Sequence, residues 1–245
     1  LHDEIMIKRI RSNKHEISFK GKFSKSISKN NTVSKLLDVL EEKKLLKNQK
    51  FQIKINKHIP NKAGLGGGSM NAANILNYFV RKKIVKSSKK GLVKISKLVG
   101  SDVVLGLNPT YSILTSKNQI KRFQNCETFF TLIVKPNFGC STKDVFKKVR
   151  KFHKPKFNQP HKSMFNIDYL KTVNNSLESI ILSKNLKLRK IKLFLENLLN
   201  PVFVRMTGSG SALVAYYQSK DSCENAKIQF NKKYKNYWCI ASKTI

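Results

Sequence analysis

The sequence predicts a protein of two α+β domains, residues 1–127 and 128–245. In the first domain, a stretch of alternating apolar and polar residues, 51–55, leads into a glycine-rich run and then into an amphipathic stretch, 72–80. Alternation with a period of two is typical of a half-buried strand, and apolar residues three and four positions apart are typical of a helix. In the second domain, an apolar strand over 129–134 opens a unit that ends with a helix and a strand. A chain of 245 residues is long enough to bury both cores.

The same two periodicities predict the other elements. A helix is expected to begin after Asn31, a residue type that caps helix N-termini well, because the apolar residues that follow it share one face. The Lys-rich stretch 147–160 is expected to be a loop. In chain order, we expect strands at 4–10, 16–19 and 51–55, helices from 32, over 72–80 and over 92–99, a strand at 129–134, helices around 177–181 and 188–198, strands on both sides of 207–211, a helix at 221–234 and a strand at 237–241.

Four glycines in five positions, between Gly64 and Gly68, are the most informative feature of the chain. Glycine costs backbone entropy and buries no side chain, so such a run is favoured where the main chain must approach another group closely. Placed before a helix, it presents free N–H groups and the positive end of the helix dipole, which is an anion-binding arrangement. The Lys-Ser/Thr of a Walker loop is missing, and Ser69 stands where a dinucleotide fingerprint needs its third glycine. The glycines alone leave both a phosphate site and a flexible turn open.

The chain carries 49 basic and 14 acidic residues, a formal net charge of +35. This balance suits a nucleic-acid surface, but only seven of the basic residues are arginine, the side chain that base and bidentate phosphate recognition favour. The lysines extend over the whole length and accompany many Asn, Ile and Phe residues, which A/T-rich codons encode. We therefore attribute the charge to genome composition, with general attraction of anionic substrates as a further contribution, and expect no specific nucleic-acid binding.

The four cysteines and five histidines show no metal-ligand spacing, so we expect thiols in a reducing compartment and no metal site. No apolar run approaches the roughly 18 residues of a membrane span, and no signal-peptide pattern is present. These observations predict a cytoplasmic protein without membrane association.

The string P-N-K-A-G-L-G-G-G-S-M-N-A-A, which starts at Pro60, resembles the ATP-binding motif of the GHMP kinases, named for galactose, homoserine, mevalonate and phosphomevalonate. P-N-F-G-C-S-T from Pro136 and M-T-G-S-G-S from Met206 resemble two further segments of that family. The resemblance implies the GHMP kinase fold, with an N-terminal domain like ribosomal protein S5 and a ferredoxin-like C-terminal domain. It also implies ATP and Mg²⁺. The residues that would bind ATP are Pro60, Asn61, Lys62, Ala63, Gly64, Leu65, Gly66, Gly67, Gly68, Ser69 and Met70.

Asp102 lies in the string G-S-D-V-V, about thirty residues beyond the glycine run. A Gly-Ser-Asp that follows a helix is by itself typical of a cap or turn. Its position matches the family segment whose Asp faces the acceptor hydroxyl, so the resemblance implies that Asp102 is catalytic. Three features depart from the family pattern: Val104 replaces a Pro, Leu107-Asn108-Pro109 replaces a following Gly-Gly turn, and Met70 replaces a second Ser whose hydroxyl would lie near the phosphates.

The family begins with a strand bearing A-K-[IL]-N, whose Lys lies near the catalytic Asp, and continues to D-G-Y-H. Leu1-His2 would be the end of that second string, which assigns His2 to the cytidine pocket; an isolated His near a terminus is also commonly just exposed. We therefore expect the chain to begin inside a longer polypeptide, with the active-site Lys encoded before Leu1.

Within the superfamily, the wording G-L-G-G-G-S-x-N-A-A is most similar to the kinases of 4-diphosphocytidyl-2-C-methyl-D-erythritol, which serve non-mevalonate isoprenoid biosynthesis. The resemblance implies transfer of the ATP γ-phosphate to the 2-hydroxyl of this small-molecule substrate, a cytidine-diphosphate-linked polyol. Two alternatives stay open. One is another GHMP kinase, of the homoserine or mevalonate type, and the other is a catalytically impaired, basic nucleic-acid-binding protein with the same fold.

Overall fold

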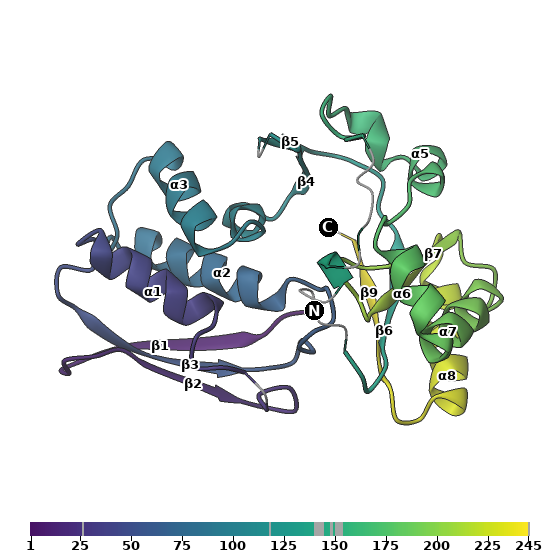
Figure 1. The fold of residues 1–245 in the computed structure, drawn as a ribbon, viewed down its shortest axis with the longest axis horizontal. Coiled ribbons are helices and arrows are strands. Elements are labelled where there is room, and N and C mark those ends of the chain that lie inside the picture. Colours follow the sequence, from purple (N-terminus) through teal and green to yellow (C-terminus); the bar gives the residue numbers. More distant parts are fainter. Residues whose placement is uncertain (26, 118, 140–144, 148, 150–153, 245) are drawn as a thin grey trace. The chain divides into compact units, whose positions relative to one another are not determined.

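The computed structural model describes residues 1–25, 27–117, 119–139, 145–147, 149 and 154–244. The last residues of P-N-F-G-C-S-T and part of the predicted loop 147–160 therefore lie outside the described residues. The chain forms two units (Figure 1). The first comprises Leu1–Asn61 and Gly66–Pro109, and the second comprises Lys62–Leu65 and Thr110–Ile245.

The first unit contains a three-stranded sheet in the order β1-β3-β2. Strands β1 (Glu4–Ile10) and β3 (Lys50–Asn56) are antiparallel, whereas β2 (Glu16–Lys20) runs parallel to β3. The register aligns the alternating apolar positions, so Ile53 lies opposite Ile7 on one side and Ile17 on the other. All three strands were expected from their alternation, because side chains along a strand point to opposite faces in turn.

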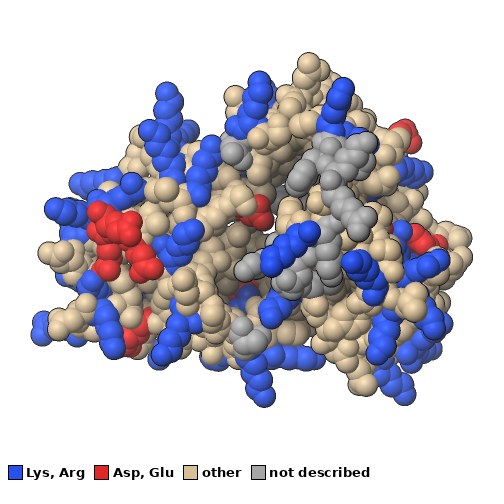
Figure 2. All heavy atoms as spheres, in the orientation of Figure 1, with Lys and Arg blue, Asp and Glu red and all other residues tan. Residues whose placement is uncertain are grey.

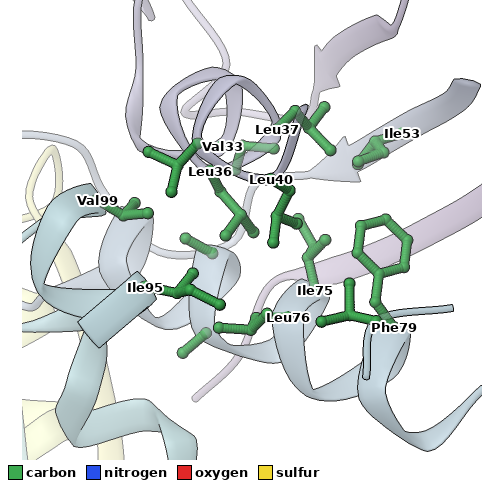
Figure 3. Packing of buried hydrophobic residues seen from close by; sticks show 14 of the residues in the cluster. Val33, Leu36, Leu37, Leu40, Ile53, Ile75, Leu76, Phe79, Ile95 and Val99 are labelled. Carbon is green, nitrogen blue, oxygen red and sulfur yellow. The ribbon is translucent and has the colours of Figure 1, made fainter. Parts of the chain in front are cut away.

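Three helices and a short 3₁₀ helix complete the first unit: α1 (Thr32–Glu42), α2 (Gly67–Arg81), α3 (Lys89–Val99) and η1 (Val103–Leu107). Asn31 caps α1 as predicted, and Ser34 closes a capping box with it. Helix α3 begins before the predicted residue 92, because Ser88 accepts a hydrogen bond from the Gly91 N–H and caps an additional turn. The helices and β3 enclose one apolar core (Figure 3). Its labelled members are Val33, Leu36, Leu37, Leu40, Ile53, Ile75, Leu76, Phe79, Ile95 and Val99.

The second unit contains an antiparallel four-stranded sheet in the order β7-β8-β6-β9. Its strands are β6 (Phe130–Lys135), β7 (Phe203–Met206), β8 (Leu213–Tyr217) and β9 (Trp238–Lys243). Helices α5 (Ile167–Thr172), α6 (Glu178–Lys184) and α7 (Leu186–Glu196) lie between β6 and β7 in the chain, and α8 (Lys220–Lys233) lies between β8 and β9. The chain order is therefore β-α-β-β-α-β, the ferredoxin-like arrangement. Residues of α7 and α8 share a buried core with β6 and β8.

Four elements in the described part of the second unit were not expected from the sequence. They are the hairpin of β4 (Tyr111–Leu114) and β5 (Ile120–Phe123), the 3₁₀ helix η2 (Lys162–Phe165) and α5. The hairpin lies before the predicted domain boundary at residue 127, whereas the contacts group it with the second unit. The boundary itself stays a prediction. None of the helices in the part of the chain that the structure describes is long and apolar enough to cross a bilayer.

Candidate functional site

Helix α2 begins inside the glycine run, earlier than the predicted residue 72. Gly66 is its N-cap and has a left-handed φ of 67°, and Met70 makes the first i→i−4 bond, with its N–H donating to the Gly66 carbonyl at 2.9 Å. The N–H groups of Gly67, Gly68 and Ser69 precede that bond and have no acceptor within the helix. Glycine is tolerated there because a first turn lies at the helix end and not in its interior. The arrangement fits an anion at this end of α2.

The loop residues Lys62–Leu65, which precede Gly66, belong to the second unit and pack on the turn between β7 and β8. The Lys62 and Ala63 carbonyls accept hydrogen bonds from the N–H groups of Ser211 (3.4 Å) and Ala212 (3.2 Å). The Thr207 hydroxyl donates to the Gly64 carbonyl at 3.0 Å. Gly64 has a φ of 72°, and a Cβ there would lie 2.1 Å from the Thr207 carbonyl oxygen. Only glycine allows this approach, so the turn that resembles the third family motif shapes this part of the loop.

Asp102 lies at the start of η1, with φ −91° and ψ −10°. Its side chain is exposed and makes no capping hydrogen bond to the described N–H groups of η1. One of its oxygens accepts a hydrogen bond from the Ser101 hydroxyl at 3.1 Å. The carboxylate therefore stays available to a ligand.

Segment η1 is fastened to α2 by hydrogen bonds and by close packing. The side-chain amide of Asn77 donates to the carbonyls of Gly106 and Leu107, both at 3.3 Å. A Cβ on Gly106 would lie 2.7 Å from the Ala73 Cβ and 3.0 Å from the Met70 sulfur. Met70, where the family has a second Ser, thus packs on η1. Helix α2 therefore carries both the N–H groups that have no acceptor within the helix and the residues that support η1, which directly follows Asp102.

Comparisons with known proteins identify the family of the chain. The family of GHMP kinases N terminal domains matches residues 31–113. The chain is 53% identical over 245 residues to the 4-diphosphocytidyl-2-C-methyl-D-erythritol kinase of Pelagibacter ubique, with 100% of this chain and 87% of that protein covered. The chain belongs to the 4-diphosphocytidyl-2-C-methyl-D-erythritol kinase family. Membership of this GHMP kinase family implies the use of ATP.

Solved kinase structures confirm the predicted two-domain fold. A 4-(cytidine 5'-diphospho)-2C-methyl-D-erythritol kinase matches with a TM-score of 0.73 at 20% identity, over 98% of this chain and 85% of that chain. The homoserine kinase of Cytophaga hutchinsonii matches with a TM-score of 0.71 at 15% identity, over 99% of this chain and 85% of that chain. At such identities the likeness shows the fold alone.

His2, assigned to the cytidine pocket from the sequence of this kinase, is exposed. Its ring meets the His58 ring edge-on, with 6.5 Å between the centroids. His58 in turn lies 3.6 Å from a Glu4 carboxylate oxygen. The structure thus groups His2 with polar residues at the ends of β1 and β3, and its role toward cytidine stays a prediction.

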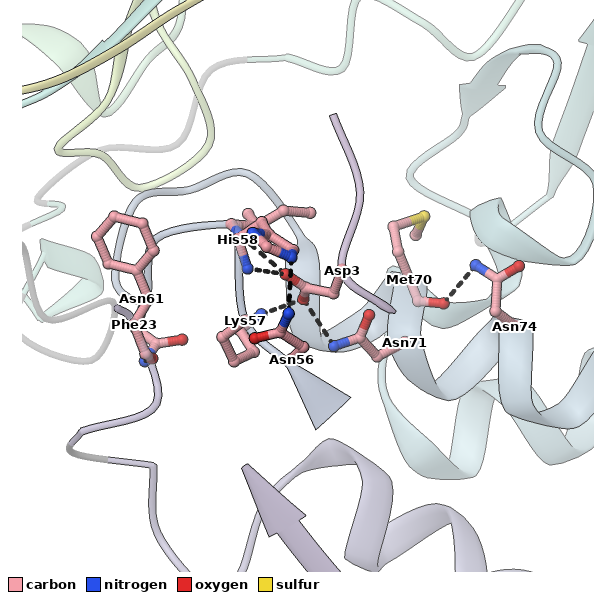
Figure 4. A network of polar contacts seen from close by, with 10 residues as sticks. Asp3, Phe23, Asn56, Lys57, His58, Asn61, Met70, Asn71 and Asn74 are labelled. Carbon is pink, nitrogen blue, oxygen red and sulfur yellow. Dashed lines mark hydrogen bonds and ion pairs between the residues drawn. The ribbon is translucent and has the colours of Figure 1, made fainter. Parts of the chain in front are cut away.

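Sequence reasoning missed a buried polar cluster below the start of α2. Asp3, Lys57 and Asn71 meet there (Figure 4), and Lys57 pairs with an Asp3 side chain that is 0% exposed. The local sequence pattern could not predict the cluster, because Lys57 and Asn71 lie 54 and 68 positions from Asp3 in the chain. Among the described residues, no group of three His, Cys, Asp or Glu side chains could hold a metal ion.

The close packing of η1 on α2 leads to a first prediction for the kinase. Gly106→Ala should push η1 away from Ala73 and misplace Asp102, lowering kcat by up to about 10²-fold, the cost of a displacement near 1 Å. Gly100→Ala is the matched control: Gly100 is even nearer to Asp102 in the chain, but its φ of 178° is extended and its Cβ would make an ordinary 3.4 Å contact. Steady-state kinetics of both variants measure the difference. Equal kcat values would show that this packing does not position Asp102.

The Asp3 carboxylate leads to a second prediction, on the pH dependence of stability. Burial disfavours its charged form, but hydrogen bonds from Lys57, the Ile59 N–H and Asn71 outweigh this and lower the pKa of Asp3 below 3.8. A depressed pKa contributes stability that is complete above the unfolded-state pKa and is lost as the pH falls through the folded-state pKa. The free energy of unfolding of Asp3→Asn should therefore lie below the wild-type value by a constant amount at neutral pH, and the two should converge below about pH 4. Urea titrations across this range measure the gap, and a gap that persists unchanged to about pH 3 would contradict the prediction.

Proposed function

We propose that the protein transfers the γ-phosphate of ATP to the 2-hydroxyl of 4-diphosphocytidyl-2-C-methyl-D-erythritol. The main supporting observation is that α2 has three N–H groups at its start without an acceptor inside the helix, and that it supports η1, which directly follows the exposed Asp102. The 53% identity to a kinase named for this substrate supports the choice of acceptor. A cytoplasmic location and a role in isoprenoid precursor biosynthesis belong to the same proposal.

The loop Pro60–Met70 would bind the β- and γ-phosphates. The N–H groups of Gly67, Gly68 and Ser69 are donors at the positive end of the α2 dipole, which favours negative charge. Gly66 is open: nothing lies within 4 Å of the Cβ that it lacks. The described residues thus fit a phosphate group held mainly by main-chain donors.

Mg²⁺ would arrive with the nucleotide. This cation is commonly held by phosphate oxygens, water and one or two protein oxygens, and the Ser69 hydroxyl in the first turn of α2 is one such oxygen. We assign the Ser69 hydroxyl to a phosphate oxygen or to the metal. When bound, Mg²⁺ neutralises charge on the phosphates.

Asp102 would orient the acceptor hydroxyl and take its proton as transfer proceeds. Phosphoryl transfer depends mainly on positioning and charge stabilisation, so a carboxylate that is held by a supported segment and exposed suits the task. His2 would contact the cytidine group.

In the first test, the purified protein, including any residues encoded upstream of Leu1, is incubated with ATP and each of three acceptor alcohols in turn. We expect phosphorylation of 4-diphosphocytidyl-2-C-methyl-D-erythritol and little turnover of homoserine or mevalonate. A preference for either of the other alcohols would overturn the proposed substrate but would leave the proposed kinase activity standing.

The alternative of a nucleic-acid-binding protein is tested by a salt titration. Figure 2 shows Lys and Arg side chains spread over the visible face, without one dominant basic patch. This spread favours weak, nonspecific attraction to nucleic acids. We expect DNA and RNA binding to disappear near physiological salt; tight binding with a steep log–log salt slope would favour the alternative.

A further inference from the structure

Asp3 collects four hydrogen-bond donors on one buried carboxylate (Figure 4). One oxygen accepts from the backbone N–H groups of His58 and Ile59, both at 2.8 Å. The other accepts from the side-chain amide of Asn71 at 2.9 Å and from the Lys57 ammonium. The side chains of Asp3 and Lys57 are 0% and 3% exposed. A carboxylate oxygen has room for two donors, so this carboxylate is fully used inside the protein.

The four donors stand on both sides of the glycine loop in the chain. His58 and Ile59 directly precede Pro60, the first residue assigned to ATP, and Asn71 directly follows Met70, the last one. Asp3 itself precedes β1, outside the loop. One carboxylate thus joins the entry of the loop to its exit.

Lys57 extends this junction beneath the first turn of α2. A Cβ on Gly67 would lie 3.0 Å from an Ile59 methyl carbon and 3.4 Å from the Lys57 ammonium nitrogen. The start of the helix therefore rests on the residues that Asp3 holds. Because Lys57 is paired with Asp3, its charge is compensated within the protein.

We propose that Asp3, acting through Lys57 and Asn71, is a positioning residue that sets the shape of the ATP-binding loop before ATP arrives. Glycines supply no side chains to hold the loop, so its geometry depends on how its ends are fixed. A site whose donors are already arranged avoids an ordering cost on binding. This inference rests on the proposed kinase function.

The test separates loop shape from stability with two variants of the full chain. Asn71→Ala removes the side-chain amide that donates to Asp3 at the end of the loop, and it leaves the Asp3–Lys57 ion pair intact. The double variant Asp3→Leu/Lys57→Met replaces the pair by apolar side chains, so that no buried charge is left unpaired. Glu16→Gln is the control, because Glu16 is an exposed carboxylate that accepts one side-chain hydrogen bond, from Gln52, far from the loop in the chain.

For each variant, calorimetry gives the ATP affinity, kinetics give KM for ATP and kcat separately, and urea titration gives the stability. We expect both loop variants to bind ATP at least tenfold more weakly and to raise KM for ATP more than they lower kcat. Glu16→Gln should match wild type. Wild-type ATP affinity in folded Asn71→Ala or in the folded double variant would overturn the inference, as would a loss confined to stability. Failure of the wild-type protein to bind ATP would instead overturn the proposed function.

Discussion

Asp102→Asn should lower kcat by about 10²–10⁴-fold, the range for a positioned acid–base group, while ATP affinity and stability stay near wild type. Asn has nearly the same size and still hydrogen-bonds, but it cannot accept the proton or supply negative charge. The structure makes the test clean, because the carboxylate is exposed and accepts its hydrogen bond from the neighbouring Ser101 hydroxyl. Little structural stabilisation is therefore lost together with the charge.

Steady-state kinetics with 4-diphosphocytidyl-2-C-methyl-D-erythritol measure this effect, and calorimetry checks ATP binding. Asp38→Asn is the matched control, since Asp38 is exposed on α1 and has no assigned role. It should change kcat by no more than a few-fold. If Asp102→Asn also turns over within a few-fold of wild type, Asp102 is only a turn residue and the mechanism is wrong.

Gly64→Ala should be the most destabilising small substitution in the loop. Its Cβ would lie 2.1 Å from the backbone carbonyl of Thr207, at a φ of 72° that favours glycine. A backbone carbonyl cannot rotate away as a side chain can, so the loop and the turn after β7 must separate. Losing their hydrogen bonds as well should cost more than about 4 kcal/mol of unfolding free energy, a value reached by few single substitutions.

Gly66→Ala is the control for Gly64→Ala. Gly66 has a φ of 67°, but nothing lies within 4 Å of its absent Cβ. Only the backbone penalty of about 1–2 kcal/mol should appear there. Urea unfolding of the two variants isolates the clash, and similar losses in both would contradict the packing of Gly64 on Thr207.

The local elements of this protein could be predicted from its sequence because they follow from backbone geometry. Alternation identified β1, β2 and β3, and the cap at Asn31 identified the start of α1. The glycine string and G-S-D-V-V predicted a phosphate loop and a catalytic acid, and these two roles stay predictions. Each of these signals is contained within a few neighbouring residues.

The tertiary structure alone decided how these pieces are held. In the structure, α2 begins at Gly67, Gly64 packs on Thr207, and Gly106 packs against Met70 and Ala73. The structure also brings Asp3 to Lys57, although 54 residues separate them in the chain. Such contacts have no period in the sequence, because the partner of a buried polar group is chosen by how whole elements pack. The sequence by itself therefore determined the elements whose signals are local and indicated the family, and the packing determined which side chains shape the site.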